Sequence, residues 1–326
     1  MKLLVTGGAG YIGSVVVERA AAAGHQIVVL DNLQEGHATA VAPGCPMVVA
    51  DYGDRAVLDR VFRDHSFDAV VHLAAETTVA TSVTDPAIYF QNNTVNGLAL
   101  LEAMRAHGVM RLVFSSTAAT YGDPLATPMT EEHPQRPINA YGESKLMFER
   151  CIAWYHRAYG LKAASFRYFN AAGATATRGE AHRHESHLIP LVLDAAAGDR
   201  PSVDVYGTDY PTRDGTCVRD FVHVADIADA HLLALDALDR LGLDWFNIGS
   251  GTGHTVAEVV AVAEAITGRP VPTRRCARRQ GDPATLVASS DRIRRELGWV
   301  PRYANLHDII DTAWRWRRQY PGGYGD

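Results

Sequence analysis

A glycine-rich turn near the start of the chain constrains the fold more than any other feature of the sequence. The segment Val5-Thr6-Gly7-Gly8-Ala9-Gly10-Tyr11-Ile12-Gly13 follows a short apolar run and opens an amphipathic stretch. Glycine permits a tight turn, lets backbone N–H groups approach a bound pyrophosphate and allows the following helix to pack close to the strand. The amino end of that helix adds a partial positive charge. This order of strand, glycine turn and helix predicts the first unit of a nucleotide-binding sheet.

Short β-branched runs alternate with longer amphipathic stretches through the first half of the chain. The predicted strands are Leu3–Val5, Ile27–Leu30, Met47–Ala50, Ala69–Leu73, Leu112–Phe114 and Ala163–Phe166. The predicted helices between them are Ile12–Ala23, Asp54–His65, Leu98–His107 and Tyr141–Tyr159. Because parallel strands need crossover connections, this alternation predicts an α/β protein with a doubly wound, Rossmann-type parallel sheet.

The rhythm of strands and helices breaks after about Asn170. We therefore predict a Rossmann domain over residues 1–170 and a smaller mixed α/β domain formed mainly by residues 171–326. Residues 220–248, which include the helical stretch Val224–Leu238, are expected to pack back on the large sheet.

Composition excludes several classes of protein. The formal net charge of -6 gives no basic surface for nucleic acid. No stretch reaches the ~18 apolar residues that a membrane span needs, and the run Met1–Val5 is too short for a signal peptide. The four cysteines stand far apart, which predicts reduced thiols in a cytoplasmic protein. They are Cys45, Cys151, Cys217 and Cys276.

An acidic residue at the end of the second predicted strand sets the cofactor preference. Asp31 follows the glycine turn at about the 20-residue spacing from which a carboxylate accepts both ribose hydroxyls of a dinucleotide. It would repel the additional phosphate of NADP, so the sequence predicts NAD. The alternative is a glycine turn that merely connects strand to helix, and the acidic partner disfavours it.

Further candidates stand where other strands end, because ligands of such sheets lie beyond the carboxyl ends of the strands. Asp51 follows the third strand, where it would meet the adenine or, alternatively, cap the helix Asp54–His65. Small residues follow the fourth and fifth strands in Leu73-Ala74-Ala75 and Ser115-Ser116-Thr117. They leave space for a cofactor, although small residues at strand ends also serve packing alone.

A tyrosine and a lysine four residues apart carry the predicted chemistry. In Tyr141-Gly142-Glu143-Ser144-Lys145 the phenol and the ammonium group share one helix face. A free tyrosine has a pKa near ~10, and a nearby cation favours its phenolate. Thr117 offers a hydroxyl that orients the substrate oxygen. Taken alone, the Tyr-x-x-x-Lys spacing would equally suit a solvated helix face.

These residues resemble the extended short-chain dehydrogenase/reductase family, and further segments narrow the resemblance to its UDP-galactose 4-epimerase branch. The segments are Gly7-Gly8-Ala9-Gly10-Tyr11-Ile12-Gly13-Ser14, Phe114-Ser115-Ser116-Thr117-Ala118-Ala119-Thr120-Tyr121-Gly122, Tyr141-Gly142-Glu143-Ser144-Lys145-Leu146-Met147, Arg167-Tyr168-Phe169-Asn170 and Asp209-Tyr210-Pro211-Thr212-Arg213-Asp214-Gly215-Thr216-Cys217-Val218-Arg219-Asp220-Phe221-Val222-His223-Val224. The resemblance covers essentially the whole chain.

The resemblance implies a reversible oxidation at C4 of a UDP-sugar. Tyr141 would take the proton of the 4-hydroxyl while a hydride passes to tightly bound NAD, and the 4-keto sugar would rotate before both return. The resemblance also implies a homodimer, formed through the helices Leu98–His107 and Tyr141–Tyr159.

The resemblance implies three overlapping sets of site residues. The catalytic residues are Thr117, Tyr141 and Lys145. The cofactor-binding residues are Gly7, Gly10, Tyr11, Ile12, Gly13, Asp31, Asn32, Asp51, Tyr52, Leu73, Ala74, Ala75, Asn93, Ser115, Tyr141, Lys145 and Tyr168. The substrate-binding residues are Thr117, Tyr141, Asn170, His187, Leu188, Tyr206, Arg219, Arg279 and Asp282. The guanidinium groups of Arg219 and Arg279 suit the two phosphates.

No metal is expected, although several histidines and glutamates gather in one segment. They are Glu180, His182, His184, Glu185 and His187. The segment is loop-like, without a helical or CxxC framework, and hydride transfer needs no metal. His187 stands where the family often carries asparagine.

Alternative functions remain at this point. A 4,6-dehydratase would carry an acidic pair directly after the threonine, whereas Thr117 is followed by Ala118 and Ala119. The substrate could instead be an N-acetylated UDP-sugar, a pentose or a uronate, since Leu286 at the position that gates bulky sugars is neither large and aromatic nor small. A non-catalytic NAD-binding regulatory protein would have no use for Tyr141 and Lys145.

Overall fold

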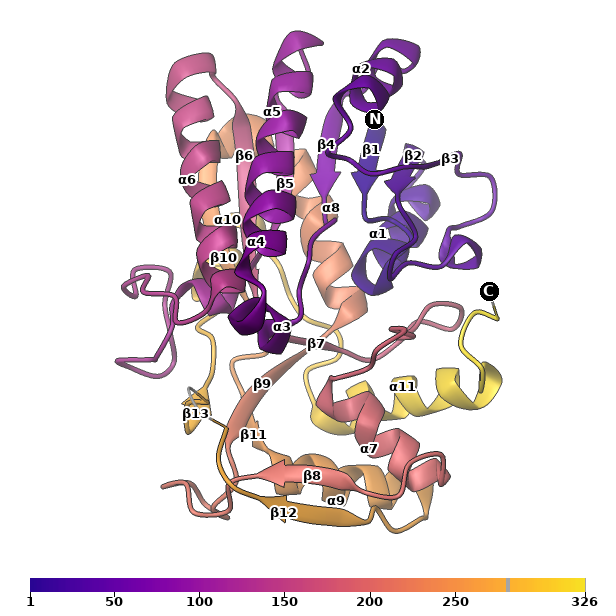
Figure 1. Ribbon diagram of the computed structural model, residues 1–326, viewed down its shortest axis with the longest axis vertical. Coiled ribbons are helices and arrows are strands. Elements are labelled where there is room, and N and C mark those ends of the chain that lie inside the picture. Colours follow the sequence, from indigo (N-terminus) through magenta and orange to yellow (C-terminus); the bar gives the residue numbers. More distant parts are fainter. Residues whose placement is uncertain (280–281, 326) are drawn as a thin grey trace.

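The structure is a computed structural model that describes residues 1–279 and 282–325. Figure 1 shows two parts, a large sheet covered by helices and a smaller part below it, with the carboxyl ends of the large sheet's strands facing the smaller part. Within the described residues no helix is both long and apolar enough to cross a membrane.

The large sheet has seven strands, all parallel, in the order β10-β6-β5-β4-β1-β2-β3. The strands are β1 (Lys2–Thr6), β2 (Gln26–Asp31), β3 (Met47–Val49), β4 (Ala69–His72), β5 (Arg111–Thr117), β6 (Lys162–Tyr168) and β10 (Leu243–Ile248). Thr6 pairs with Leu30 on one side and His72 on the other, so neighbouring strands end at the same edge. This confirms the predicted doubly wound parallel sheet.

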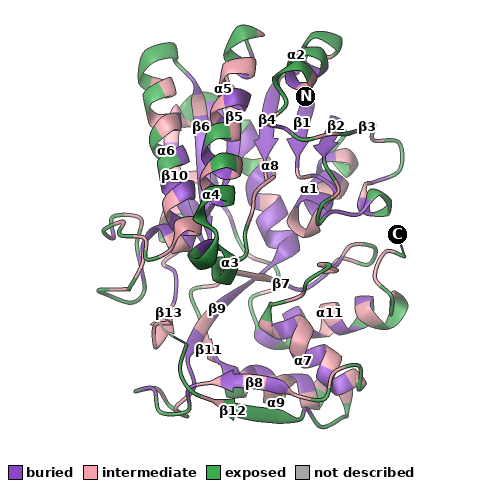
Figure 2. Ribbon diagram, in the orientation of Figure 1, coloured by how far each residue is buried: buried purple, intermediate pink, exposed green. Residues whose placement is uncertain are grey.

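Helices cover both faces of this sheet. One face carries α1 (Tyr11–Ala22), α8 (Val224–Leu241) and α10 (Asp291–Leu297). The other carries α2 (Arg55–Asp64), α5 (Gly97–Ala106) and α6 (Ala140–Tyr159). The short helices α3 (Val79–Thr84), α4 (Pro86–Tyr89) and the π-helix η2 (Phe90–Asn96) lead from β4 into α5, and the 3-10 turns are η1 (Ala38–Ala40) and η3 (Ala118–Thr120). Figure 2 shows the strands buried between the two helical layers.

The smaller part is a mixed α/β unit. Strand β9 (Val218–His223) pairs in parallel with β7 (Asn170–Ala172) and β13 (Thr285–Leu286) and antiparallel with β11 (Gly253–Thr255). Strands β8 (Val203–Tyr206) and β12 (Thr273–Cys276) form a parallel pair. Helices α7 (Leu188–Ala197), α9 (Val256–Thr267) and α11 (Leu306–Gln319) share a separate apolar core, which includes Val192, Val259 and Ile310.

The chain crosses between the two parts more than once. After β9 in the smaller sheet, α8 and β10 return to the large sheet, and α10 packs there too through Ile293 and Leu297. The interval 220–248, proposed from the sequence as the returning segment, therefore includes residues 220–223 that pair in the smaller sheet. The division at residue 170 remains a prediction.

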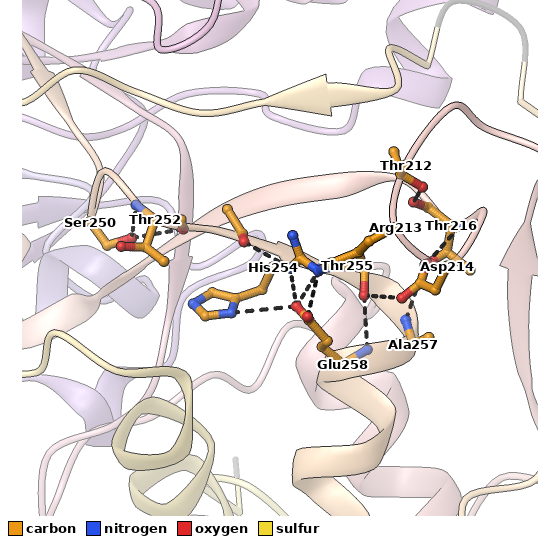
Figure 3. Close-up of polar contacts among 11 residues, drawn as sticks. Thr212, Arg213, Asp214, Thr216, Ser250, Thr252, His254, Thr255, Ala257 and Glu258 are labelled. Carbon is orange, nitrogen blue, oxygen red and sulfur yellow. Dashed lines mark hydrogen bonds and ion pairs between the residues drawn. The ribbon is translucent and has the colours of Figure 1, made fainter.

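A loop before β9 is fixed to the start of α9 by side-chain contacts (Figure 3). Asp214 accepts a hydrogen bond from the Thr255 hydroxyl at 2.5 Å, and the Arg213 Nε donates to Glu258 at 2.5 Å. Thr255 and Glu258 also form a capping box on α9. These contacts hold the chain immediately before Arg219, a predicted substrate ligand on β9.

Candidate active site

The glycine turn between β1 and α1 has no room for side chains. Gly7 adopts a positive φ of 72°, and a Cβ there would lie 2.5 Å from the backbone N of Ala74. A Cβ on Gly13 would lie 1.9 Å from the carbonyl oxygen of Gly7. Gly10 precedes α1 without a side-chain cap, so the first N–H groups of the helix are available to an anion. The cradle fits the pyrophosphate of a dinucleotide.

Asp31 ends β2 beside this cradle, as the sequence predicts. Its carboxylate accepts hydrogen bonds from the backbone N–H groups of Ala9 at 3.0 Å and Leu33 at 2.9 Å. Burial raises the pKa of Asp31, while these two bonds act to lower it. Leu33 takes a φ of 60°, which is unusual for a residue with a side chain. The turn holds the carboxylate at the strand end, where a ribose would lie.

Asp51 does not cap the following helix, so that alternative interpretation is wrong. The cap of α2 is Asp54, whose Oδ1 accepts from the backbone N–H groups of Ala56 and Val57. Asp51 instead accepts from the N–H of Gly53 at 2.6 Å and lies 3.4 Å from the side-chain nitrogen of Asn32. Asp51 and Asn32 thus lie together at the predicted adenine end. The neighbouring Tyr52 is buried and donates to the carbonyl of Asn92.

Asn93 connects the chain after β4 to the helix that carries Tyr141. Its amide side chain bonds the backbone N and O of Glu76 at 2.9 and 3.0 Å, and its Nδ2 donates to the Ser144 hydroxyl at 3.0 Å. Asn93 lies in the π-helix η2, a rare element that is frequent at functional sites. Shortly before Glu76, the backbone N–H groups of Leu73 and Ala74 both donate hydrogen bonds to the carbonyl of Thr6. Ala75 follows them and is partly buried.

Thr117, Tyr141 and Lys145 meet at the carboxyl end of β5. A hydrogen bond joins Thr117 and Tyr141, and it acts against the burial that raises the pKa of Tyr141 to about 12. Burial lowers the pKa of Lys145 to about 7, against an opposing effect of Glu149. The ammonium group donates to the carbonyl of Ser115 at 2.9 Å. The structure thus brings the predicted phenol and hydroxyl into contact and places the Lys145 ammonium group at the Ser115 carbonyl, near the end of the same strand.

Glu149 is a neighbour of this site that the sequence analysis missed. It accepts from the Ser116 hydroxyl at 2.5 Å and forms an ion pair with Arg167 at 2.7 Å, with both charged side chains less than 5% exposed. Its position four residues after Lys145 on one helix face was the available signal. Through Glu149, the ion pair connects Ser116 near the end of β5 to Arg167 on the neighbouring strand β6. Further along the same edge, the Tyr168 hydroxyl lies 2.7 Å from Nε2 of His231.

The predicted substrate ligands of the smaller part form two linked groups. Arg219 forms an ion pair with Asp282 and donates to the carbonyl of Pro283 at 2.9 Å. The guanidinium of Arg279 lies 3.9 Å from the centre of the Tyr206 ring. The two pairs are connected through the backbone, since the Asp282 N–H donates to the Arg279 carbonyl at 3.3 Å, and the Arg219 guanidinium is partly engaged by a carboxylate.

The remaining substrate candidates stand on β7 and at the start of α7. Asn170 donates to the carbonyl of Asp220 at 2.8 Å, which ties β7 to β9. His187 precedes α7, Leu188 is the first residue of that helix, and the His187 Nδ1 lies 2.8 Å from Glu185. Asp220 itself is fully buried and accepts from the N–H groups of Ser250, Gly251 and Ala288. Its role is structural, at the junction of the two parts.

Comparison with known proteins assigns the family. The model of the NAD dependent epimerase/dehydratase family matches residues 3–249. The UDP-glucose 4-epimerase of Lacticaseibacillus casei is 49% identical over 329 residues, covering 100% of this chain and 99% of the relative. A crystal structure of a UDP-glucose 4-epimerase superimposes with a TM-score of 0.97 at 45% identity, covering 99% of each chain.

A ligand-bound relative has the same architecture. The crystal structure of UDP-glucose 4-epimerase from Bifidobacterium longum in complex with NAD+ and UDP matches with a TM-score of 0.95 at 34% identity, over 99% of this chain and 100% of that chain. Sequence, fold and the glycine cradle agree, and the chain belongs to the NAD dependent epimerase/dehydratase family.

Proposed function

We propose that the chain is a UDP-glucose/UDP-galactose 4-epimerase. The observation that carries the proposal is the buried group of Thr117, Tyr141 and Lys145 at the sheet edge that also holds the glycine cradle and Asp31. Full-length relatives with this activity support it. When bound across that edge, NAD supplies a hydride acceptor that returns the hydride in the same turnover.

Tyr141 is the group that moves a proton at the sugar 4-hydroxyl. A phenol with a pKa of about 12 is a weak acid that is hardly ionised at neutral pH, so forming its phenolate needs positive charge nearby. The Lys145 ammonium supplies such charge from the same helix face, and its bond to the Ser115 carbonyl keeps it in place. The Thr117 hydroxyl positions the sugar oxygen next to Tyr141. After the 4-keto sugar has rotated, the same tyrosine returns the proton to the C4 oxygen.

The smaller part would hold the nucleotide while the sugar stays free to rotate. Arg219 and Arg279 offer guanidinium groups for the phosphates, and Tyr206 offers a ring beside Arg279. Asn170, His187, Leu188 and Asp282 complete the proposed set. Tight binding of UDP with few contacts to the sugar suits this reaction, because the sugar must rotate to present either face of C4 to the cofactor. In this proposal Asp282 gives up part of its ion pair with Arg219 when the substrate binds, and contacts the substrate instead.

We further propose a cytoplasmic homodimer. Its support is the exposed apolar surface on and near the dimer helices that the family resemblance implies, including Trp154, Tyr159 and Val95. All four cysteines are free, which agrees with a reducing compartment.

Proton NMR of UDP-galactose incubated with the purified protein and no added NAD tests the function. Conversion to UDP-glucose would support both the reaction and a retained cofactor. Parallel incubations with UDP-N-acetylgalactosamine and a UDP-pentose measure the preference, which Leu286 would influence from its contact with the cluster of Ala118, Tyr121 and Met129. If no sugar is converted, the incubations are repeated with added NAD. A negative result there as well would contradict the proposal and favour a non-catalytic NAD-binding protein.

A further inference from the structure

Two imidazoles and two carboxylates converge in the loop between β7 and α7. The residues are Glu180, His182, Glu185 and His187, and one ligand atom from each lies within 4.8 Å of all the others. Two glutamates and two histidines so close together make a donor set of mixed nitrogen and oxygen. No metal was expected from the sequence, because this segment has neither a helical nor a CxxC framework.

The spacing of the donor atoms approaches that of a tetrahedral site. Nδ1 of His187 lies 2.8 Å from an oxygen of Glu180 and 2.8 Å from an oxygen of Glu185. Nδ1 of His182 lies 3.3 Å from Glu180 and 3.8 Å from Glu185. Zinc ligands at about 2.0 Å from the ion would lie about 3.3 Å from one another. The four contacts lie on both sides of this value, but His187 faces Oε1 of Glu185 and His182 faces Oε2, so the Glu185 carboxylate must turn to offer one oxygen to the ion.

The surroundings hold the donors in place but leave one of them unsatisfied. The Glu180 side chain is only 7% exposed. One oxygen of Glu185 accepts from the backbone N–H groups of Ser186 and His187, both at 2.7 Å, which orients the carboxylate. Nδ1 of His182 is buried and faces Glu180 at 3.3 Å and Glu185 at 3.8 Å, but neither contact has the geometry of a hydrogen bond. A cation between these atoms would satisfy the imidazole and both carboxylates together.

The loop is also anchored outside the cluster. The carbonyl of Ala181 lies 2.7 Å from the ring nitrogen of His37, and the Tyr324 hydroxyl donates to the carbonyl of Gly179 at 3.1 Å. The Tyr11 ring meets the His182 ring edge-on at 6.4 Å. Glu180, His182 and Glu185 line a cavity of about 470 Å³. An ion therefore has a preformed pocket and a path to it.

We propose that Glu180, His182, Glu185 and His187 bind a divalent transition-metal ion, with Zn²⁺ the best match. Two carboxylates balance the charge of the ion, and imidazole with carboxylate is a donor set that zinc accepts in tetrahedral sites. The ion stands outside the hydride-transfer site and fixes the loop that leads into α7. His187 also belongs to the proposed substrate-binding set, so the test changes only Glu180 and His182 and reads metal content, which is independent of the proposed epimerase activity.

Metal analysis of the full-length, tag-free protein tests the site. After equilibration with ZnCl₂ and removal of free ion, elemental analysis should find one zinc per chain. Calorimetric titration of EDTA-treated protein with ZnCl₂ should show one site. Glu180→Gln and His182→Asn should each weaken binding by more than the roughly 10–100-fold that losing an outer-shell partner of a ligand costs. Co²⁺ in place of Zn²⁺ should give the intense visible absorption of a tetrahedral complex.

His184→Asn is the matched control, since His184 belongs to the same loop but is 93% exposed and contacts Glu35 rather than the cluster. It should bind zinc like the wild type. If His184→Asn lost as much zinc affinity as the Glu180 and His182 variants, surface histidines would be capturing the ion and the proposed site would be wrong. If the ligand variants do not fold, the wild-type titration decides alone. Substoichiometric zinc without a tetrahedral Co²⁺ spectrum overturns the proposal, because the cluster is then only a set of ion pairs.

Discussion

Burial acts on Tyr141 and Lys145 in opposite directions, and both effects favour neutral groups. It raises the pKa of the phenol to about 12 and lowers that of the ammonium group to about 7. The sequence predicts that the Lys145 cation, helped by the positive nicotinamide, lowers the pKa of Tyr141 toward neutrality. In the protein by itself the dominant effect on Tyr141 is burial, opposed by the Thr117 hydrogen bond. A reactive phenolate therefore depends on positive charge gathered around it at the time of reaction.

Tyr141→Phe removes the proton acceptor while keeping the ring. We expect turnover of UDP-galactose to fall by about 10²–10⁴-fold, the usual contribution of a positioned acid–base group, with NAD content unchanged. Coupled assay and cofactor extraction measure the two quantities. Tyr159→Phe, on the same helix but 53% exposed, should keep wild-type turnover. A Tyr141→Phe enzyme within threefold of the wild type would disprove the role of the phenol.

Lys145 makes stability depend on pH with a defined sign. Its pKa is about 7 in the folded protein and 10.5 in an unfolded chain, so the unfolded chain binds more protons between these pH values. The cost of the buried ammonium group is complete below pH 7 and disappears above pH 10.5. The unfolding free energy of the wild type relative to Lys145→Met should therefore rise with pH through this window.

The difference in unfolding free energy between the wild type and Lys145→Met should rise by at most ~1.4 kcal/mol per pH unit. Melting temperatures of both proteins, recorded from pH 7 to pH 10, measure it. Lys162→Met, which removes a lysine that pairs with Asp239 at the surface, should not reproduce the trend. A constant difference between wild type and Lys145→Met would mean that the ammonium group is better solvated than its burial indicates.

At the scale of elements, the contact between β1 and α1 depends on the absence of a side chain at Gly13. Gly13→Ala would place a Cβ 1.9 Å from the Gly7 carbonyl oxygen, so the helix must move away from the turn. We expect the variant to lose at least tenfold in NAD affinity, because the displaced N–H groups no longer match the pyrophosphate. Fluorescence titration of cofactor-free protein with NAD measures the loss. Gly322→Ala, with open space around it, is the control and should bind NAD like the wild type.

Elements with a clear period could be predicted from the sequence, and those fixed by tertiary contacts could not. The strands around Val5 and Val113 and the helix that carries Tyr141 follow from short apolar runs and amphipathic spacing. The π-helix at Asn93 has no such pattern, because it depends on the contacts of Asn93 with Glu76 and Ser144. The two-residue strand at Leu286 exists only through pairing with β9.

At the scale of the whole molecule, residues that meet across distant segments were the hardest to predict. The cofactor half of the site could be predicted because the ends of parallel strands share one edge. The contacts of Arg219 with Asp282 and of Tyr206 with Arg279 join segments more than 60 residues apart. The family resemblance indicated these residues as substrate ligands but not their contacts with one another. The convergence of Glu180 and His187 depends on a loop path that no sequence period encodes.

The proposed dimer places an exposed aromatic surface of α6 against a second copy. Trp154 is 65% exposed, and Met147 and Tyr159 on the same helix are 38% and 53% exposed, while Figure 2 shows α3 and α4 exposed nearby. Trp154→Glu would replace the exposed ring with a carboxylate that must lose its water in a helix-to-helix interface, so the variant should elute as a monomer of 35.4 kDa where the wild type is a dimer. Light scattering after size-exclusion chromatography measures both masses. Val300→Glu, a 77% exposed position beyond α10 and thus on the opposite side of the sheet, should leave the dimer intact. A Trp154→Glu protein that stays dimeric would place the interface on another face, and the exposed residues of α6 would then need a different partner.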